Sequence, residues 1–227
     1  MQRRVSSMKF APSTWVFPGG GVDPRDEAPD IPWAGPSATE WARRIGVSEA
    51  AARTIVIAAV REVFEECGVL LAGPSADDIV SDVTGQDWQD DRAALLDKSL
   101  SFAELLRRRH LVLRSDLLAL QDHWVTPEME PRRYDTWFFA ARMPHRQVAD
   151  DRTTEADVAA WCRPAAMLDE AGTGSARMFP PTLVQLRRLA TWHDLAPATV
   201  SREGLGTVLP VPVRDGDRVM LRAQLND

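Results

Sequence analysis

The chain has 227 residues, of which 44% are hydrophobic and 26% are charged, and its formal net charge is −6. These fractions are close to the averages of folded globular domains, which excludes extensive disorder. Net negative charge makes a nucleic-acid partner unexpected, although a local phosphate site needs only a metal ion and a few arginines. We expect one domain over residues 1–227.

The chain has no stretch of about 18 uncharged residues, so no membrane span is expected. Its first residues, MQRRVSSMKF, lack the apolar run of a signal peptide. Cys67 and Cys162 have no spacing typical of a metal finger or a disulfide framework. The cytoplasm is therefore the expected compartment.

The first predicted element is a short strand at residues 13–24, STWVFPGGGVDP. Trp15, Val16 and Phe17 favour a strand, and the three glycines that follow favour a turn. A short helix is predicted next, where Ser37 and Glu40 form a candidate capping box and Gly46 a stop.

The strongest helical pattern covers residues 47–68, because Ser48 can cap the helix, alanines and straight side chains fill it, and Gly68 can end it. Residues 86–125 are predicted to be mainly helical, with Ser101 and Glu104 as another capping box.

The C-terminal half is predicted to alternate strands and helices, ending in a hairpin. The expected elements are a strand at 132–143, a loop, short strand and helix start at 156–168, a helix at 183–195 capped by Thr182 and Gln185, and a hairpin at 209–223 turning at Asp215 and Gly216. Prolines 210 and 212 confine the first arm of this hairpin to an edge.

Glu62, Glu65 and Glu66 crowd one turn of the strongest helix. Like charges at these spacings cost about a few tenths of a kcal/mol per pair. At 3.6 residues per turn they fall within about 100° of one another, and the apolar residues Val56, Val60, Val63 and Cys67 cluster about 140° away. Carboxylates at this spacing can share hard divalent ions. The alternative is an ordinary solvated helix face.

Two further features favour the metal. Arg61 and Gly68 complete the pattern R-E-apolar-x-E-E-x-G-apolar, which chance seldom produces. The upstream glycine turn, FPGGGVD, offers a backbone carbonyl and room for phosphate oxygens.

These residues resemble the Nudix hydrolases, whose box reads G-x5-E-x7-R-E-U-x-E-E-x-G-U, where U is a bulky apolar residue. Gly20 matches the first glycine, and residues 61–69 match the second half at every fixed position. Residues 21–60 separate the halves, about 27 more than the pattern allows. The middle glutamate is left unassigned, because counting forward from Gly20 gives Asp26 and counting back from Arg61 gives Arg53.

Such an interruption resembles the coenzyme A diphosphatase branch of the family. The segments that look like this branch are residues 10–23, 58–72, 131–144 and 178–190. The resemblance implies an α/β/α sandwich with a mixed sheet, decorated by helical insertions at about 27–55 and 86–120. It also implies Mg²⁺ or Mn²⁺ as cofactor.

The resemblance implies a role for each residue of the box. Glu62 and Glu66 would be metal ligands, Glu65 a third, and the Gly20 region would offer a carbonyl. Arg61 would hold the carboxylates in orientation through charge-assisted hydrogen bonds. Glu62, or an acid outside the box, would accept the proton from water.

Three residues outside the box are candidates for the same site. Glu155 is a candidate accessory ligand or base, because the family commonly places an acid on a loop before a strand carrying tryptophan, and Trp161 fits that picture; a solvated loop acid is the alternative. Arg132 and Arg133 are candidate substrate contacts, since guanidinium matches phosphate, with paired surface arginines as the alternative.

The expected function is metal-dependent hydrolysis of a nucleoside diphosphate derivative, with coenzyme A or an acyl-CoA favoured. Hydrolysis of ADP-ribose, NADH or a dinucleotide is an alternative, and so is a catalytically silent nucleotide sensor. The family normally has a strand and hairpin upstream of the glycine turn, but only about 14 residues precede the strand here. Either the true start lies further upstream, or the C-terminal hairpin, a partner subunit or nothing fills that edge. Because an open edge invites association, a homodimer is a candidate assembly.

Overall fold

The computed structural model describes residues 1–7, 11–150, 156–216 and 218–226. Its α-helices are α1 (Ala38–Ile45), α2 (Glu49–Cys67), α3 (Gln86–Leu96), α4 (Phe102–Arg108), α5 (Pro164–Gly172) and α6 (Pro180–Ala190). Short 3-10 helices lie at η1 (Pro24–Asp26), η2 (Ser115–Leu117) and η3 (Ala196–Thr199). Within the described ranges, no helix combines the length and the hydropathy needed to span a bilayer.

Among the residues that the structure describes, the strands form four small sheets. One has the order β2 (Trp15–Val16), β1 (Gln2–Arg4), β8 (Ala156–Ala159), and a second has the order β3 (Trp33–Ala34), β5 (Val112–Arg114), β4 (Ala72–Gly73). The remaining two are pairs: β6 (Leu118–Val125) with β7 (Asp135–Ala141), and β9 (Val211–Asp215) with β10 (Arg218–Arg222). The second sheet is mixed, since β3 runs parallel and β4 antiparallel to β5. The expected α/β class with a mixed sheet is confirmed.

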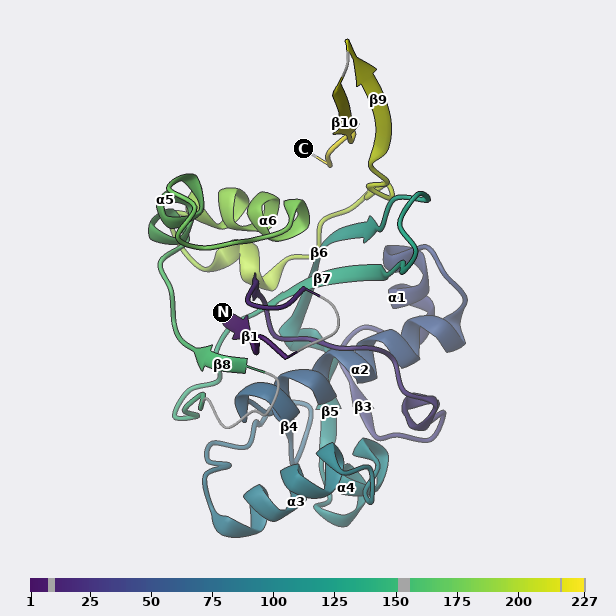
Figure 1. The fold of residues 1–227 in the computed structure, drawn as a ribbon. Helices are drawn as coiled ribbons and strands as arrows, with labels where there is room; N and C mark the ends of the chain where they lie inside the picture. Colours follow the sequence, from purple (N-terminus) through teal and green to yellow (C-terminus); the bar gives the residue numbers. More distant parts are fainter. Residues whose placement is uncertain (8–10, 151–155, 217, 227) are drawn as a thin grey trace.

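Helix α2 crosses the middle of the molecule, with β1 and the β6–β7 pair on one side and α3 and α4 on the other, while α5 and α6 cover the far side of the strands (Figure 1). Its side chains Val56, Ile57 and Val60 are fully buried in the main core. A smaller cluster around Met167 and Leu186 packs α5 and α6 onto the first two strands. The central helix is therefore enclosed rather than amphipathic, which fixes its C-terminal half firmly in place.

The predicted boundaries of the first two helices are confirmed. The Ser37 hydroxyl accepts from the Glu40 N–H, and Gly46 ends α1 with φ +80°. The Ser48 hydroxyl accepts from the Ala51 N–H, and Gly68 ends α2 with φ +64°. Each glycine adopts the left-handed conformation that a side chain would strain.

The prediction of mainly helical structure over residues 86–125 is wrong for its last third. Helices α3 and α4 form, and Ser101 and Glu104 make the predicted capping box, but β5 and β6 follow. Strand β6 is buried on both faces, with only His123 and Val125 partly exposed. A strand covered on both sides need not alternate apolar and polar residues, and β6, with the sequence LALQDHWV, does not show the alternation that predicts a strand.

The predicted cap of the helix before residue 195 is also wrong. Helix α6 begins earlier, with Phe179 as N-cap and prolines at its first positions, where the missing N–H costs nothing. Thr182 and Gln185 are instead buried inside the helix.

The edge beside the glycine turn is filled by the chain's own first residues. Strand β1 pairs antiparallel with β2, where Gln2 faces Val16, and with β8 on its other side. The C-terminal hairpin forms as predicted, but it does not cover this edge.

Asp122 on β6 is the centre of a buried polar network. Its Oδ2 atom accepts from Gln185 Nε2 at 2.6 Å and from Arg188 Nη1 at 3.2 Å. The amide of Asn226, near the C-terminus, donates to Oδ1 at 2.8 Å. Burial opposes the charge, but hydrogen bonds from Asn226, Trp124 and Gln185 outweigh it and hold the pKa of Asp122 below its usual value.

Replacing Asp122 with asparagine should destabilise the protein by about 3–5 kcal/mol at neutral pH, because Arg188 loses its buried counter-charge. A carboxylate with a lowered pKa contributes stability above its usual pKa and loses it as the pH falls below about 4. The wild-type free energy of unfolding should therefore fall more steeply on acidification than that of the variant. Chemical denaturation at neutral and acidic pH checks this, with the exposed Asp30→Asn as control; parallel pH profiles would contradict it.

Candidate active site

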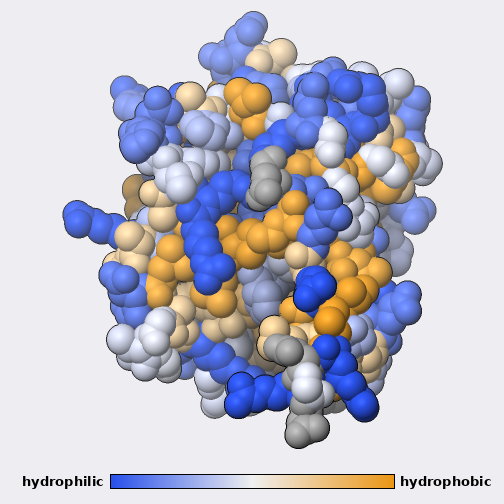
Figure 2. Space-filling view, turned by 90° about the horizontal axis from the view of Figure 1, so that it is seen from above, coloured by the Kyte–Doolittle hydropathy of each residue, from blue (hydrophilic) through white to orange (hydrophobic). Residues whose placement is uncertain are grey.

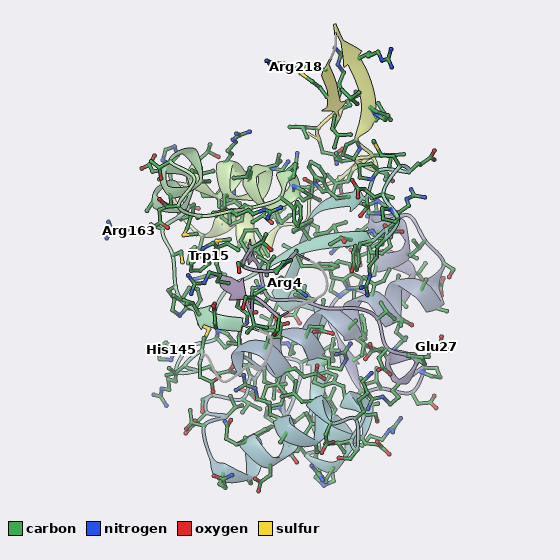
Figure 3. The ribbon with its side chains drawn as sticks, in the orientation of Figure 1. Arg4, Trp15, Glu27, His145, Arg163 and Arg218 are labelled. Carbon is green, nitrogen blue, oxygen red and sulfur yellow. The ribbon has the colours of Figure 1, made fainter. Side chains whose placement is uncertain are left out.

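A buried ion pair joins the glycine-rich segment to the central helix. Arg61 donates from Nε to Asp26 Oδ1 at 2.9 Å and from Nη2 to Asp26 Oδ2 at 3.0 Å. The side chains are 7% and 1% exposed. Two parallel N–H···O bonds to one carboxylate are the strongest arrangement an arginine can make. The short helix η1, which ends at Asp26, is thereby fixed against α2; Glu27, which marks this turn in Figure 3, is exposed.

The same guanidinium organises the glutamates. Arg61 Nη1 donates to Glu62 Oε1 at 2.8 Å and to Glu65 Oε2 at 2.9 Å, and Nη2 donates to the Gly21 carbonyl at 2.9 Å. Burial alone would lower the pKa of Arg61, but the hydrogen bond to Asp26 and the charges of Glu62, Asp26 and Glu65 raise it well above its usual value. The predicted orienting role thus has a structural basis in these contacts.

The glycine turn lies directly against the carboxylates. The Gly19 N–H donates to Glu66 Oε2 at 2.8 Å. A Cβ atom added to Gly20 would come within 2.4 Å of Glu62 Oε1, so only glycine allows this approach. At Gly21 the same addition would meet nothing within 4 Å. The close fit at Gly20 keeps the turn and Glu62 in contact.

The glutamate face of α2 is not an open solvated surface. Glu65 and Glu66 are 7% and 6% exposed, so the alternative of a solvated face is wrong for both. Burial raises the pKa of Glu65, with the charge and hydrogen bond of Arg61 acting against the rise. Carboxylates buried at this cost need partners, which Arg61 supplies only in part.

The donor chemistry of this site fits a hard divalent ion. Glu62 and Glu66 lie one helical turn apart, both against an exposed glycine turn whose backbone approaches them closely. Oxygen donors of this kind suit magnesium and manganese. Within the ranges that the structure describes, however, no three acidic, histidine or cysteine side chains already converge as a metal-binding group. The metal ligands Glu62, Glu65, Glu66 and Gly20 therefore remain a prediction.

Of the two positions reached by counting for the middle acid of the box, Asp26 belongs to the site. Arg53 lies elsewhere, with its guanidinium carbon 4.9 Å from the centre of the Trp33 ring. The signal for Asp26 was its distance of six residues from Gly20, but sequence spacing alone could not show that the chain returns to Arg61.

The remaining candidates stand apart from this cluster. Glu155 falls outside the described residues. Arg132 and Arg133 lie in the exposed turn between β6 and β7, where Arg132 packs on the Tyr134 ring at 5.6 Å and Arg133 Nε donates to the Thr126 carbonyl at 3.0 Å. These contacts are local, so substrate binding by either arginine remains a prediction.

Removing Asp26 should leave the Arg61 charge buried with fewer partners. We expect Asp26→Ala to lower the free energy of unfolding by about 3–5 kcal/mol, as for other broken buried ion pairs. The matched control is Asp157→Ala, which breaks an ion pair with Arg3 whose side chains are both 42% exposed. The control should change little, because exposed pairs contribute little. Equal losses for the two variants, measured by urea denaturation, would contradict the proposed clamp.

Comparison with known proteins agrees with this geometry. A family model described as the NUDT19 Nudix domain matches residues 46–189. A putative nudix hydrolase 7 from Caenorhabditis elegans is 29% identical over 194 residues, which cover 86% of this chain and 56% of the relative. An acyl-coenzyme A diphosphatase NUDT19 from Xenopus laevis is 24% identical over 262 residues, covering 96% of this chain and 67% of the relative.

The chain thus spans between about half and two thirds of the length of these relatives. Among solved structures, a NUDIX hydrolase from Alicyclobacillus acidocaldarius matches with a TM-score of 0.69 and 25% identity, over 88% of this chain and 87% of the other. The fold class expected from the sequence is confirmed by this neighbour. Because the family model covers more than half of the chain and includes the glutamate helix, the chain belongs to the Nudix hydrolase family.

Proposed function

We propose that this protein is a divalent-metal-dependent diphosphatase whose substrate is coenzyme A or an acyl-CoA, giving 3′,5′-ADP and (acyl-)4′-phosphopantetheine. The observation that carries the proposal is the clamp of Arg61 and Asp26, which holds Glu62 and Glu65 beside the glycine turn. The coenzyme A part rests on likeness to the Xenopus laevis relative, whose name gives that activity.

In this proposal Glu62 and Glu66 hold the metal with the Gly20 region, and Mg²⁺ or Mn²⁺ is the expected ion. A bound ion would lower the pKa of a water molecule and neutralise charge on the phosphoryl oxygens. Arg61 keeps Glu62 and Glu65 in orientation. The carboxylate of Glu62 accepts the proton from the attacking water, and its low exposure of 12% limits competing solvent.

Arg4 gives further support for an anionic substrate. It lies on β1 beside β2, which leads into the glycine turn; Arg4 and Trp15 are both labelled in Figure 3. The Gln2 amide of the same strand contacts Cys67 Sγ of α2 at 3.8 Å, so β1 lies close to the helix that carries the glutamates. The Nε atom of Arg4 is buried and has no hydrogen-bond partner among the described residues. A diphosphate oxygen would satisfy this donor.

One observation favours the alternative of a silent nucleotide sensor. Arg61 already binds both Glu62 and Glu65, which leaves these carboxylates less available to a metal. Turnover separates the two functions, because a sensor binds nucleotide without producing product.

The decisive experiment incubates the protein with coenzyme A, acyl-CoA, ADP-ribose and NADH, each with Mg²⁺, Mn²⁺ or a chelator, and resolves the products chromatographically. We expect 3′,5′-ADP from coenzyme A with metal and none with chelator. Glu66→Ala should reduce kcat at least about 100-fold, since a metal ligand contributes several kcal/mol. Glu49→Ala, an exposed glutamate at the start of the same helix, should leave kcat unchanged. Binding without turnover of any substrate would overturn the proposal.

Gly20→Ala should displace Glu62, because the new methyl carbon would lie 2.4 Å from its Oε1 atom. Misplacing a catalytic group by about 1 Å can cost about 100-fold in rate. We expect a loss of this order in kcat with the substrate identified above. Gly21→Ala, which meets nothing within 4 Å, should keep kcat within about threefold. Similar rates for the two variants would contradict the role of Gly20.

A further inference from the structure

The last turn of α2 is an unfavourable place for carboxylates. Residues 64–67 read FEEC, so this turn carries Glu65 and Glu66 and no basic side chain. The C-terminal end of a helix bears a partial negative charge, which destabilises anions and stabilises cations there. Both glutamates are buried, so water does little to offset the repulsion. The turn that presents these carboxylates therefore needs support from outside the helix.

Arg92 on α3, the helix drawn below α2 in Figure 1, brings a cation to this end. Its Nε atom donates to the Glu65 carbonyl oxygen at 2.7 Å. The last four carbonyls of an α-helix have no partner within the helix, and this bond satisfies one of them. Hydrophilic side chains cover much of the face seen in Figure 2, whereas Arg92 is only 2% exposed.

Asp150 binds both to Arg92 and to the end of the helix. Its Oδ1 atom accepts from Arg92 Nη1 at 2.6 Å, in an ion pair whose arginine side chain is 3% exposed and whose aspartate side chain is 27% exposed. The backbone N–H of Asp150 donates to the Cys67 carbonyl at 3.0 Å. The ion pair of Arg92 and Asp150 thus takes two carbonyls at the end of α2.

The same ion pair packs directly against Gly68, which ends α2. A Cβ atom added to Gly68 would lie 3.2 Å from Arg92 Nη1 and 3.3 Å from Asp150 Oδ2. These distances are shorter than most Cβ contacts in proteins, so the missing side chain lets the pair approach the helix. Gly68 therefore supplies both the left-handed conformation that ends α2 and the room for its external support.

Two buried arginines thus support the glutamates in different ways. Arg61 binds the carboxylates of Glu62 and Glu65, whereas Arg92 binds the main chain of the last turn. The main chain of this turn sets the direction in which the side chains of Glu65 and Glu66 leave the helix. The contacts of Arg61 alone leave that main chain unsupported at its end.

We propose that Arg92 and Asp150 are positioning residues, which hold the last turn of α2 in the geometry that a divalent ion requires of Glu65 and Glu66. The inference rests on the proposed function, because a bound ion is what makes this geometry useful. Replacing residues that orient metal ligands typically weakens metal binding about 10- to 100-fold. The charge of Arg92 acts in the opposite direction, since a nearby cation repels the ion. Weaker binding in an Arg92 variant therefore reports lost geometry rather than lost charge.

The first test is hydrogen–deuterium exchange of the full-length chain without metal, read by mass spectrometry. Arg92→Met should raise exchange about tenfold in peptides covering residues 62–69 and much less in the first half of α2, because only the last turn loses its support. The matched control is Arg114→Met. Arg114 is 8% exposed, and its side chain bonds to the Asp116 carboxylate and the Asp78 carbonyl rather than to α2. A uniform rise along α2 in the Arg92 variant, or the same local rise in the control, would overturn the proposal.

The second test measures Mn²⁺ affinity without substrate, by electron paramagnetic resonance of the free ion. Arg92→Met should bind Mn²⁺ about tenfold more weakly than the wild type, and Arg114→Met should bind it equally well. Equal or tighter binding by Arg92→Met would overturn this proposal and leave the proposed function standing. A wild-type protein that binds no Mn²⁺ would instead overturn the proposed function, and this inference with it.

A milder variant keeps both tests decisive if Arg92→Met does not fold, which circular dichroism shows. Asp150→Asn retains the backbone N–H that bonds to Cys67 and an oxygen that can accept from Arg92, but it removes the counter-charge. It should show the same local exchange and the same weaker Mn²⁺ binding to a smaller extent. A folded Asp150→Asn variant that matches the wild type in both measurements would overturn the proposal.

Discussion

The site depends on the burial of one guanidinium between two distant parts of the chain. Arg61 reaches the carboxylate of Asp26, the carboxylates of Glu62 and Glu65, and the carbonyl of Gly21. A lysine could not replace it, because an ammonium group offers three donors on a point charge and cannot grip a carboxylate with two parallel bonds. By binding the glutamates together, the planar guanidinium holds carboxylates that would otherwise repel one another in fixed positions.

This clamp also explains how the box tolerates its long interruption. About forty residues separate Gly20 from Arg61, and closing so long a loop costs entropy, although the cost rises only slowly with length. Helix α1 and the buried Ile31 and Trp41 pack the intervening segment into the main core. Asp26 then fixes the start of the interruption against the helix that ends it. The inserted residues are thus part of the structure that supports the site.

The sequence predicted best those features that depend on local chemistry. The caps Ser37 and Ser48 and the stops Gly46 and Gly68 need only neighbouring backbone groups, and all four were placed correctly. Strands β5 and β6 were missed, because burial on both faces is a tertiary property that removes the alternating pattern. The ion pair between Asp26 and Arg61 could not be predicted for a similar reason, because spacing along the sequence does not show which residues an insertion brings together in the fold.

The last part of the chain is tied down on both sides of the hairpin. Before β9, Val208 bonds to β6, and after β10, the Asn226 amide bonds to buried Asp122 while its carbonyl accepts from Arg188 at 2.7 Å. A segment anchored at both ends has less freedom to lose when it becomes ordered against another surface. The hairpin is therefore preorganised: its position is fixed by the contacts before and after it, including the buried polar network, rather than by the strands themselves.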